Sequence, residues 1–407
     1  MLIKQVINQN HCSETTAGTK MGSDQEYAAS EMREIRIGEK KRKTILIKNS
    51  KTQNEANENA FESKLPTVSG VPDQTFEKAK QGIVNTIGWM IQTQAKLGGL
   101  LGYFKNASFD RTPPENHKAY AFHANRGKNR NQDIPLHDAT RVRLRIEKET
   151  DNNYINASTV SCLPCDRKWI VAQHPMEQYY GDFWKMVFHE EIDVIFAIFS
   201  PNEALPTYFP KETGKFFNHG DFFVHCWKMT PATGRNQATS YTIEVLPHGC
   251  SNARYTTILH YPHWPKDQVA PSAKVILKGI QSLQPADKIT KGRCLVHSSD
   301  GLNRSMCFVM VDFIVELMFR NNTVDIHELI LLLSGQRGGA FNNRIFCVYA
   351  LYVAIDYVKI RLTKFKNDPD LLSEIENLQA AMRREFSHIT PKEPNRNKMK
   401  NTTDATE

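Results

Sequence analysis

The sequence predicts a domain of the α/β or α+β class built around a central β-sheet. From about residue 110 onward, short apolar runs rich in β-branched and aromatic residues are interleaved with longer segments of helical periodicity. Strands and helices mixed within one stretch are typical of these two classes. The composition agrees, because 40% hydrophobic and 24% charged residues in 407 are ordinary values for a globular chain. This length suits one large domain or two average ones, and no internal repeat is visible.

The strand-like segments are short apolar runs bounded by polar or turn-forming residues. We expect strands over 141–146, 169–172, 194–199, 222–229, 240–245, 256–261 and 294–297. The helical segments lie between and after them. We expect helices over 178–189, 274–283, 304–319, 324–333, 343–360 and 371–386, and one or two more within 74–104. Together these elements predict a domain over residues 75–387.

The two ends of the chain differ in composition from this domain. Residues 1–70 are polar, contain few aromatic residues and lack periodicity, which predicts a disordered extension, and residues 388–407 predict a polar tail. The extension contains a run of basic residues, which are Lys40, Lys41, Arg42 and Lys43. This run either directs the protein to the nucleus or an anionic surface, or is a solvated group of charges without a specific role.

The charge and the cysteine content limit the class of protein. The net charge of +8 fits partners that carry phosphate or acidic groups, whereas no nucleic-acid-binding motif is present. The N-terminus lacks the apolar core of a signal peptide, and polar residues interrupt the longest semi-apolar stretch, 83–104, so we expect no membrane span. Eight cysteines in a chain of this length do not indicate a disulfide scaffold. We therefore expect an intracellular, cytoplasmic protein, or a nuclear one if the basic run is a targeting signal.

One pair of cysteines has the spacing of metal ligands. Cys162 and Cys165 are separated by Leu-Pro, but no second pair lies nearby in the sequence. The pattern therefore favours a turn with two thiols over a metal site. The sequence indicates no metal and no cofactor.

The segment from Cys294 to Met306 has the pattern of a phosphate-binding loop. An apolar strand ends at His297, small and polar residues follow, and an apolar helix starts at about Arg304. Loop amides and a helix N-terminus at such a turn attract an anion, and an arginine there can donate two hydrogen bonds to phosphate. The candidate phosphate-binding residues are Ser299, Asp300, Gly301, Leu302, Asn303 and Arg304. By itself the pattern also fits a helix N-terminus with Arg304 on the surface.

The same segment resembles the active-site signature of the protein-tyrosine phosphatase family, Val-His-Cys-Ser-x-Gly-x-Gly-Arg-Ser/Thr-Gly. The residues in register with it are His297, Ser299, Gly301, Arg304 and Ser305. Other motifs resemble those of the family and follow its order: Lys-Asn-Arg at 128–130, Asn-Tyr-Ile-Asn-Ala at 153–157, Trp-Ile-Val-Ala-Gln-His-Pro at 169–175, Asp-Phe-Trp at 182–184, Tyr-Phe-Pro at 208–210, Tyr-Pro-His-Trp-Pro at 261–265 and Gln-Arg at 336–337. The resemblance covers roughly residues 75–385. It implies an α/β fold with a twisted mixed central sheet flanked by helices on both faces.

The catalytic residues that this resemblance implies are replaced. The family's nucleophilic cysteine falls on Ser298, whose hydroxyl ionises far less readily than a thiol and needs a neighbouring base. The family's general acid, the aspartate of Trp-Pro-Asp, falls on Lys266, which follows Trp264 and Pro265. Asp267 lies one position later. It is either a solvated carboxylate or, after a shift of the loop, a displaced acid.

Substrate recognition and the loop itself also depart from the family. Asn131 replaces a tyrosine that stacks on phosphotyrosine, whereas Asp133, which in the family holds the peptide backbone, is retained. The glutamine that positions the hydrolytic water falls on Asn342. Asp300 replaces the usual alanine and adds a carboxylate that repels phosphate. Asn303 replaces a glycine, and asparagine tolerates a left-handed backbone.

We therefore interpret the chain as a pseudophosphatase that binds phosphotyrosine-containing or other signalling proteins. A scaffold that has lost phosphate binding is the first alternative, favoured by Asp300 and Asn131. A weak residual phosphatase that uses Asp267 or another nucleophile is the second. The loss of several catalytic residues at once resembles the phosphatase-like sets of polydnaviruses, which implies a viral protein acting on signalling inside infected host cells.

Overall fold

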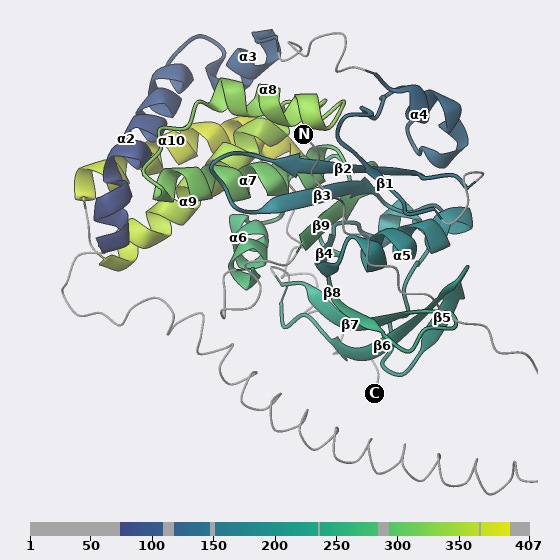
Figure 1. The fold of residues 1–407 in the computed structure, drawn as a ribbon. Helices are drawn as coiled ribbons and strands as arrows, with labels where there is room; N and C mark the ends of the chain where they lie inside the picture. The colour runs from purple at the N-terminus through teal and green to yellow at the C-terminus, as the bar shows by residue number, and fades with distance from the viewer. Residues whose placement is uncertain are drawn as a thin grey trace, which may run out of the picture. The chain divides into compact units, whose positions relative to one another are not determined.

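The computed structural model describes residues 74–108, 118–146, 151–234, 237–283, 293–365 and 368–390. In these residues a nine-stranded sheet has the order β1-β2-β3-β9-β4-β8-β7-β6-β5 (Figure 1). Its strands are β1 (Arg141–Arg143), β2 (Tyr154–Ser161), β3 (Lys168–Gln173), β4 (Ile192–Ala197), β5 (Phe216–His219), β6 (Phe222–Thr230), β7 (Thr239–Pro247), β8 (Arg254–His260) and β9 (Arg293–Ser298). Strands β3, β9, β4 and β8 are parallel neighbours, and antiparallel pairs continue the sheet on both sides. The sheet is therefore mixed, as the resemblance implies.

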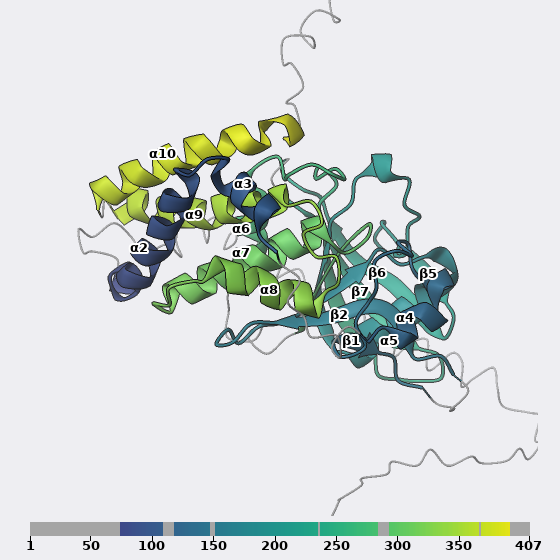
Figure 2. The same ribbon diagram turned by 90° about the horizontal axis from the view of Figure 1, so that it is seen from above.

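Helices cover both faces of this sheet (Figures 1 and 2). They are α2 (Gln74–Gln94), α3 (Gly99–Asn106), α4 (Tyr120–Ala124), α5 (Tyr180–His189), α6 (Ala273–Ser282), α7 (Asn303–Phe319), α8 (Ile326–Gln336), α9 (Ile345–Phe365) and α10 (Pro369–Phe386). Short 3-10 helices are η2 (Arg126–Lys128), η3 (Glu177–Tyr179), η4 (Pro201–Glu203) and η5 (Ser387–Ile389). Helix α7 packs on β9 and β3 and is covered by α2 and α9, whereas α5 lies on the opposite face.

Strand β3 shows how the sheet divides two hydrophobic cores. Trp169 and Val171 belong to the core shared with α7 and α9, and Ile170 and Ala172 belong to the core shared with α5. Successive side chains of a strand point to opposite faces, so an apolar run without polar interruptions is buried on both.

Helix α7 is the centre of the helical layer and positions the candidate site. Its residues are buried almost throughout, so it is apolar on all sides. It starts after a short loop at the end of β9, which lies between β3 and β4 in the sheet. The loop therefore lies at the carboxyl end of the parallel strands, where α/β proteins place ligands.

Each strand and helix expected from the sequence has a counterpart, with ends that shift by a few residues. Strand β5 and helix α4 were not expected, and β2 was expected only from the family resemblance. The predicted extension, 1–70, with the run from Lys40 to Lys43, lies outside the described residues. The start of the predicted tail packs on the domain, since Val269 N donates to Ile389 O at 3.0 Å. Among the described helices, none combines the length and apolar character needed to cross a membrane.

Candidate phosphate-binding site

The candidate phosphate-binding residues form the tight loop between β9 and α7. Gly301 in this loop has a left-handed backbone, with φ of 70°, and a Cβ atom there would lie 2.3 Å from the carbonyl oxygen of Ala172. Only glycine fits, because the loop passes directly against β3 at this point. Helix α7 begins at Asn303, so its first free amides point toward the loop.

A buried arginine outside the loop orients the loop's peptide groups. The guanidinium of Arg337 donates to the carbonyl oxygens of Asp300 at 3.1 Å and Gly301 at 3.3 Å, and to Asn156 Oδ1 at 2.8 Å. Burial lowers the pKa of Arg337 to about 10, so it stays charged at neutral pH. In a trans peptide the N–H points opposite to the C=O. The amides of Gly301 and Leu302, which follow these carbonyls, therefore point away from Arg337, and the Leu302 amide donates to Asp300 Oδ1.

Ser298 ends strand β9 and is fully buried. Its Oγ accepts a hydrogen bond from Ser305 Oγ at 2.9 Å. Among the described hydrogen bonds, no histidine or carboxylate contacts this hydroxyl. Within the described contacts, this hydroxyl therefore has no base beside it.

The histidine that precedes Ser298 is engaged elsewhere. His297 Nε2 lies 2.7 Å from the Tyr208 hydroxyl, and burial lowers the pKa of His297 well below its usual value. Burial also lowers the pKa of His174 to about 3 and that of His260 to about 4. These three imidazoles are therefore neutral at physiological pH and form part of the packing beneath the loop.

Arg304 forms a buried ion pair with Glu203, a residue of η4. The distances are 2.7 Å from Nη1 to Oε1 and 2.6 Å from Nη2 to Oε2, and the two side chains are 3% and 7% exposed. Nη1 also donates to Trp264 O at 2.8 Å, and Nη2 lies 3.4 Å from Ser299 Oγ. Burial raises the pKa of Glu203, but Arg304 and the hydrogen bonds from Ser200 together outweigh that effect, and the net pKa is lowered. In the described hydrogen bonds, Nε of Arg304 has no acceptor, which leaves this edge available to an anion.

Asp300 uses one of the loop amides. Its Oδ1 accepts a hydrogen bond from Leu302 N at 3.1 Å. The Asp300 carboxylate also lies close enough to Arg337 to act on that residue's pKa. Each of the two arginines at the loop, Arg304 and Arg337, therefore has a carboxylate nearby that offsets its charge.

The segment that follows Trp264, where the resemblance implies a general acid, is joined to Arg304 by the carbonyl oxygen of Trp264. Trp264 is buried, and its Nε1 donates to Gln268 O at 2.8 Å, which closes the loop. The side chains of Lys266 and Asp267 are exposed. Asp267 has a φ of 57°, and its carboxylate makes none of the described contacts with the phosphate loop.

The turn from Asn131 to Ile134, called the recognition turn because the resemblance implies substrate recognition there, is folded onto itself. Asn131 Oδ1 accepts from Asp133 N at 2.9 Å and from Ile134 N at 3.2 Å, while the Asp133 side chain is exposed. The turn is nevertheless beside the loop, because Asn131, Asp300 and Leu302 line one small hollow. Asn342 is exposed and does not line that hollow.

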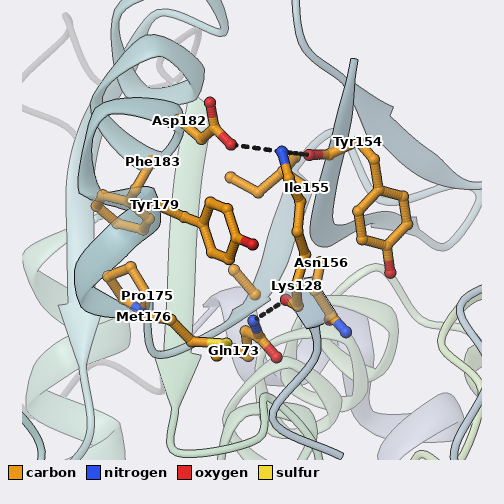
Figure 3. Close-up of a pocket in the computed structure, with 11 residues that line it drawn as sticks. Lys128, Tyr154, Ile155, Asn156, Gln173, Pro175, Met176, Tyr179, Asp182 and Phe183 are labelled. Atoms are coloured by element: carbon orange, nitrogen blue, oxygen red, sulfur yellow. Dashed lines mark hydrogen bonds and ion pairs between the residues drawn. The ribbon is translucent and has the colours of Figure 1, made fainter. Parts of the chain in front are cut away.

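A second hollow lies between η2, β2, β3 and α5 (Figure 3). Lys128 Nζ lies 2.8 Å from Asp182 Oδ2 and 3.4 Å from Tyr154 O, and 4.8 Å from the centre of the Tyr179 ring. The cavity volume is near 20 Å³, room for about one water molecule. This hollow is part of the packing behind the recognition turn.

Comparison with known proteins identifies the family of this domain. Residues 125–355 match the family described as Protein-tyrosine phosphatase. The chain belongs to the protein-tyrosine phosphatase family. It is 26% identical over 262 residues to Tyrosine-protein phosphatase 69D of Drosophila melanogaster, a match that covers 57% of this chain and 18% of that protein.

Two further relatives show similar identity. Tyrosine-protein phosphatase non-receptor type 2 of Mus musculus is 26% identical over 230 residues, 55% of this chain and 55% of that protein. Receptor-type tyrosine-protein phosphatase C of Homo sapiens is 26% identical over 260 residues, 62% of this chain and 19% of that protein. This protein-tyrosine phosphatase family member thus spans 18% to 55% of the length of these relatives.

Two features of the site differ from what the sequence indicated. Glu203 was not singled out, although Ser-Pro-Asn-Glu at 200–203 is a capping-box pattern, which the structure contains. Asn303 was expected to tolerate a left-handed backbone. That reason was wrong, because Asn303 is the first residue of α7 and its Oδ1 accepts from Asn343 N at 3.0 Å.

Proposed function

We propose that this chain is a catalytically inactive member of its family that binds phosphotyrosine-containing proteins without hydrolysing them. The environment of Ser298 supports this most strongly. Its buried hydroxyl accepts from Ser305 Oγ at 2.9 Å, and no base activates it within the described hydrogen bonds. A serine nucleophile needs such a base. The adjacent His297 does not serve as one, because it is neutral and hydrogen-bonded to the Tyr208 hydroxyl.

The two catalytic losses act on the same reaction. Removing the nucleophile of a serine protease costs on the order of 10⁶ in rate. Loss of a general acid costs on the order of 10² to 10⁴. The exposed ammonium of Lys266, at the position of the family's acid, is no substitute for a carboxylic acid directed at the leaving group. We therefore expect no turnover above background.

The loop retains the parts that hold phosphate. The amides that follow Asp300 and Gly301 point away from Arg337, and Arg304 keeps an unused Nε–H edge in the described contacts. Asp300 opposes binding, because two unit charges about 6 Å apart at an effective dielectric near 20 repel by roughly 3 kcal/mol. A charge-assisted hydrogen bond from arginine contributes about 1.5–3 kcal/mol. The repulsion by Asp300 and the gain from an arginine hydrogen bond are comparable in size, so phosphate binding is weaker than in a loop without Asp300.

The partners of this proposal are phosphotyrosine-containing signalling proteins, which the chain would shield from active enzymes. The resemblance to polydnavirus proteins extends the proposal to interference with signalling in infected host cells. Capture of tyrosine-phosphorylated proteins from lysates of stimulated insect cells, lost after treatment of the lysate with an active tyrosine phosphatase, tests this extension. Capture that is unchanged by the treatment contradicts it.

The direct test is a titration of the full chain with a phosphotyrosine peptide and its unphosphorylated copy. We expect the chain to prefer the phosphorylated peptide. In Arg304→Lys the affinity for that peptide should fall at least about tenfold, because lysine keeps a positive charge beside Glu203 but loses the planar guanidinium with its several donors. Lys168→Ala is the matched control, because it removes an exposed positive charge at the opposite end of β3. Equal affinity for the two peptides would overturn the proposal.

A scaffold without phosphate binding is the second candidate, favoured by the Asp300–Leu302 hydrogen bond and by the pairing of Arg304 with Glu203. In that case the hydrogen-bonding groups of the loop are paired with other groups of the same chain and are not available to phosphate. Inorganic phosphate separates the two functions, since it competes with phosphotyrosine for the loop. Partner binding that persists unchanged at high phosphate concentration favours the scaffold.

A further inference from the structure

The turn between β2 and β3 holds two cysteine side chains in contact. Cys162 and Cys165 flank Leu163, which is 90% exposed at the tip of the turn, whereas the two cysteines are 5% and 6% exposed. The backbone N–H of Cys165 donates to the carbonyl oxygen of Cys162 at 2.8 Å, and Cys162 Sγ donates to the carbonyl oxygen of Leu163 at 3.7 Å. The two thiols are close enough for each to shift the pKa of the other. A turn of this type keeps its first and fourth Cα atoms within about 7 Å, which is the separation that a disulfide spans.

We propose that Cys162 and Cys165 form a redox-active dithiol that closes to an intramolecular disulfide with peroxide or a small-molecule disulfide as the oxidant. This proposal is independent of phosphate binding. Within the described residues, no group of three or more His, Cys, Asp or Glu side chains is placed to hold a metal ion, and the proposal concerns the thiol chemistry of the pair.

The surroundings of Cys162 and Cys165 make this pair more reactive than the other buried thiols of the described residues. The neighbouring Cys165 side chain lowers the pKa of Cys162, and Cys162 in turn raises the pKa of Cys165. Burial raises the pKa of the four other buried thiols, which are Cys226, Cys294, Cys307 and Cys347. Since the thiolate is the reactive form, Cys162 is the first of the buried thiols to react, and Cys165 resolves it.

The turn is fixed on helix α7, so the thiols stay together. Arg167, two residues after Cys165, forms an ion pair with Asp312 of α7. Arg320 Nη2 lies 2.6 Å from Asp166 Oδ2. Closing the disulfide therefore requires rotation of two side chains and leaves the strands in place.

The oxidation balances with peroxide as the oxidant. The Cys162 thiolate attacks one peroxide oxygen, the O–O bond breaks, and the leaving hydroxide takes a proton to become water. The resulting sulfenic acid is attacked by the Cys165 sulfur, the S–O bond breaks, and a second water leaves with the Cys165 proton. Two thiols lose two electrons and two protons, and one peroxide becomes two waters.

The test is peptide mapping of the full chain after mild peroxide treatment and blocking of the remaining thiols with a maleimide. Cleavage after Lys148 and Arg167 gives peptide 149–167, which contains Cys162 and Cys165 and no other cysteine. We expect this peptide to lose about 2 Da and to carry no maleimide after oxidation, and to carry two maleimides after reduction. The exposed Cys250, in peptide 236–254, serves as an internal control that stays alkylated.

The variants Cys162→Ser and Cys165→Ser complete the test. Each is expected to abolish the loss of 2 Da, since one thiol alone cannot form the bond. Replacing Cys12 by Ser in every sample removes a thiol that lies outside the described residues, whereas Cys250 is kept as the alkylation control. Peptide 149–167 that still carries two maleimides after oxidation would overturn the proposal, and so would a disulfide from either cysteine to another part of the chain.

Discussion

Arg304 and Glu203 are joined by two hydrogen bonds of 2.7 and 2.6 Å directly beneath the phosphate loop. The side chains are 3% and 7% exposed, so neither charge can be solvated if its partner is removed. The pair fixes the guanidinium in place and offsets its charge. Both effects shape what the loop can bind and how the domain tolerates substitution.

Loss of one partner of this pair should destabilise the domain. Glu203→Ala leaves a buried guanidinium unpaired, and we expect the free energy of unfolding to fall by about 3–5 kcal/mol. The double variant Glu203→Leu with Arg304→Met removes both charges and should recover most of that loss. Urea unfolding of the three proteins measures it. A Glu203→Ala variant as stable as the wild type would show that the pair is not buried in solution.

The same pair predicts a pH dependence of stability. The folded pKa of Glu203 lies below the ordinary value of 4.5, because Arg304 and the hydrogen bonds from Ser200 together outweigh burial. A group with a lowered folded pKa stabilises the protein above its unfolded pKa, and that contribution is lost as the pH falls through the folded pKa. The stability difference between wild type and Glu203→Gln should therefore be constant above pH 4.5 and shrink below it. A difference that grows on acidification would contradict this assignment.

Removing the loop carboxylate should strengthen phosphate binding. Asp300→Asn keeps an oxygen that can accept from Leu302 N but loses the negative charge. With a repulsion of roughly 3 kcal/mol discounted for partial exposure, we expect phosphotyrosine-peptide affinity to rise by about tenfold or more. Asp221→Asn, at the exposed β5–β6 turn, is the control for net charge. Unchanged affinity in Asp300→Asn would indicate that phosphate does not enter the loop.

The tight passage of the loop against β3 predicts a large effect of one methyl group. In Gly301→Ala the Cβ atom would meet the carbonyl oxygen of Ala172 at 2.3 Å on top of the strain of a φ of 70°. Gly249→Ala is a matched control, because Gly249 has a φ of 76° and its Cβ would meet nothing within 4 Å. We expect a loss of about 1 kcal/mol for Gly249→Ala and at least about twice that for Gly301→Ala. Thermal unfolding of both variants measures the difference, and equal losses would argue against this loop geometry.

Restoring the nucleophile alone should not restore hydrolysis. Under the proposed function, Ser298→Cys supplies a thiol, but Lys266 would still occupy the position of the acid and Asp300 would still repel phosphate. We expect activity above background only in the triple variant Ser298→Cys, Lys266→Asp and Asp300→Ala. Phosphate release from a phosphotyrosine peptide measures it. Full activity in Ser298→Cys alone would show that the acid is supplied by another residue.

Part of the fold could be predicted because its signals are local. The apolar run of β9, the glycine that follows it and the apolar α7 mark the strand, the turn and the helix in one short segment. Strand β2 gave a weaker signal, since two of its polar residues, Asn156 and Ser158, are buried. Arg337 donates to Asn156 Oδ1 at 2.8 Å and to Ser158 Oγ at 3.4 Å. Polar residues at these positions are therefore not a sign of an exposed segment. Strand β5 is short and exposed, and only pairing with β6 defines it.

The candidate site was predicted as a set of positions but not as a network. The residues of the loop are adjacent in the sequence and can be recognised as one motif, whereas Glu203 lies 101 residues from Arg304. Nothing local tells that these two charges are paired. The inward turn of Asn131 onto Asp133 N likewise depends on a side-chain rotamer, which residue type alone does not determine.

The measurement that tests the central claim most directly is a phosphorus NMR titration of a phosphotyrosine peptide with the full chain. Binding changes the shift or width of the peptide's phosphate resonance, and hydrolysis produces a separate resonance of inorganic phosphate. We predict a perturbed peptide resonance and no inorganic phosphate over hours at stoichiometric protein. Accumulation of inorganic phosphate that Ser298→Ala abolishes, or a peptide resonance that the protein leaves unchanged, would contradict the account.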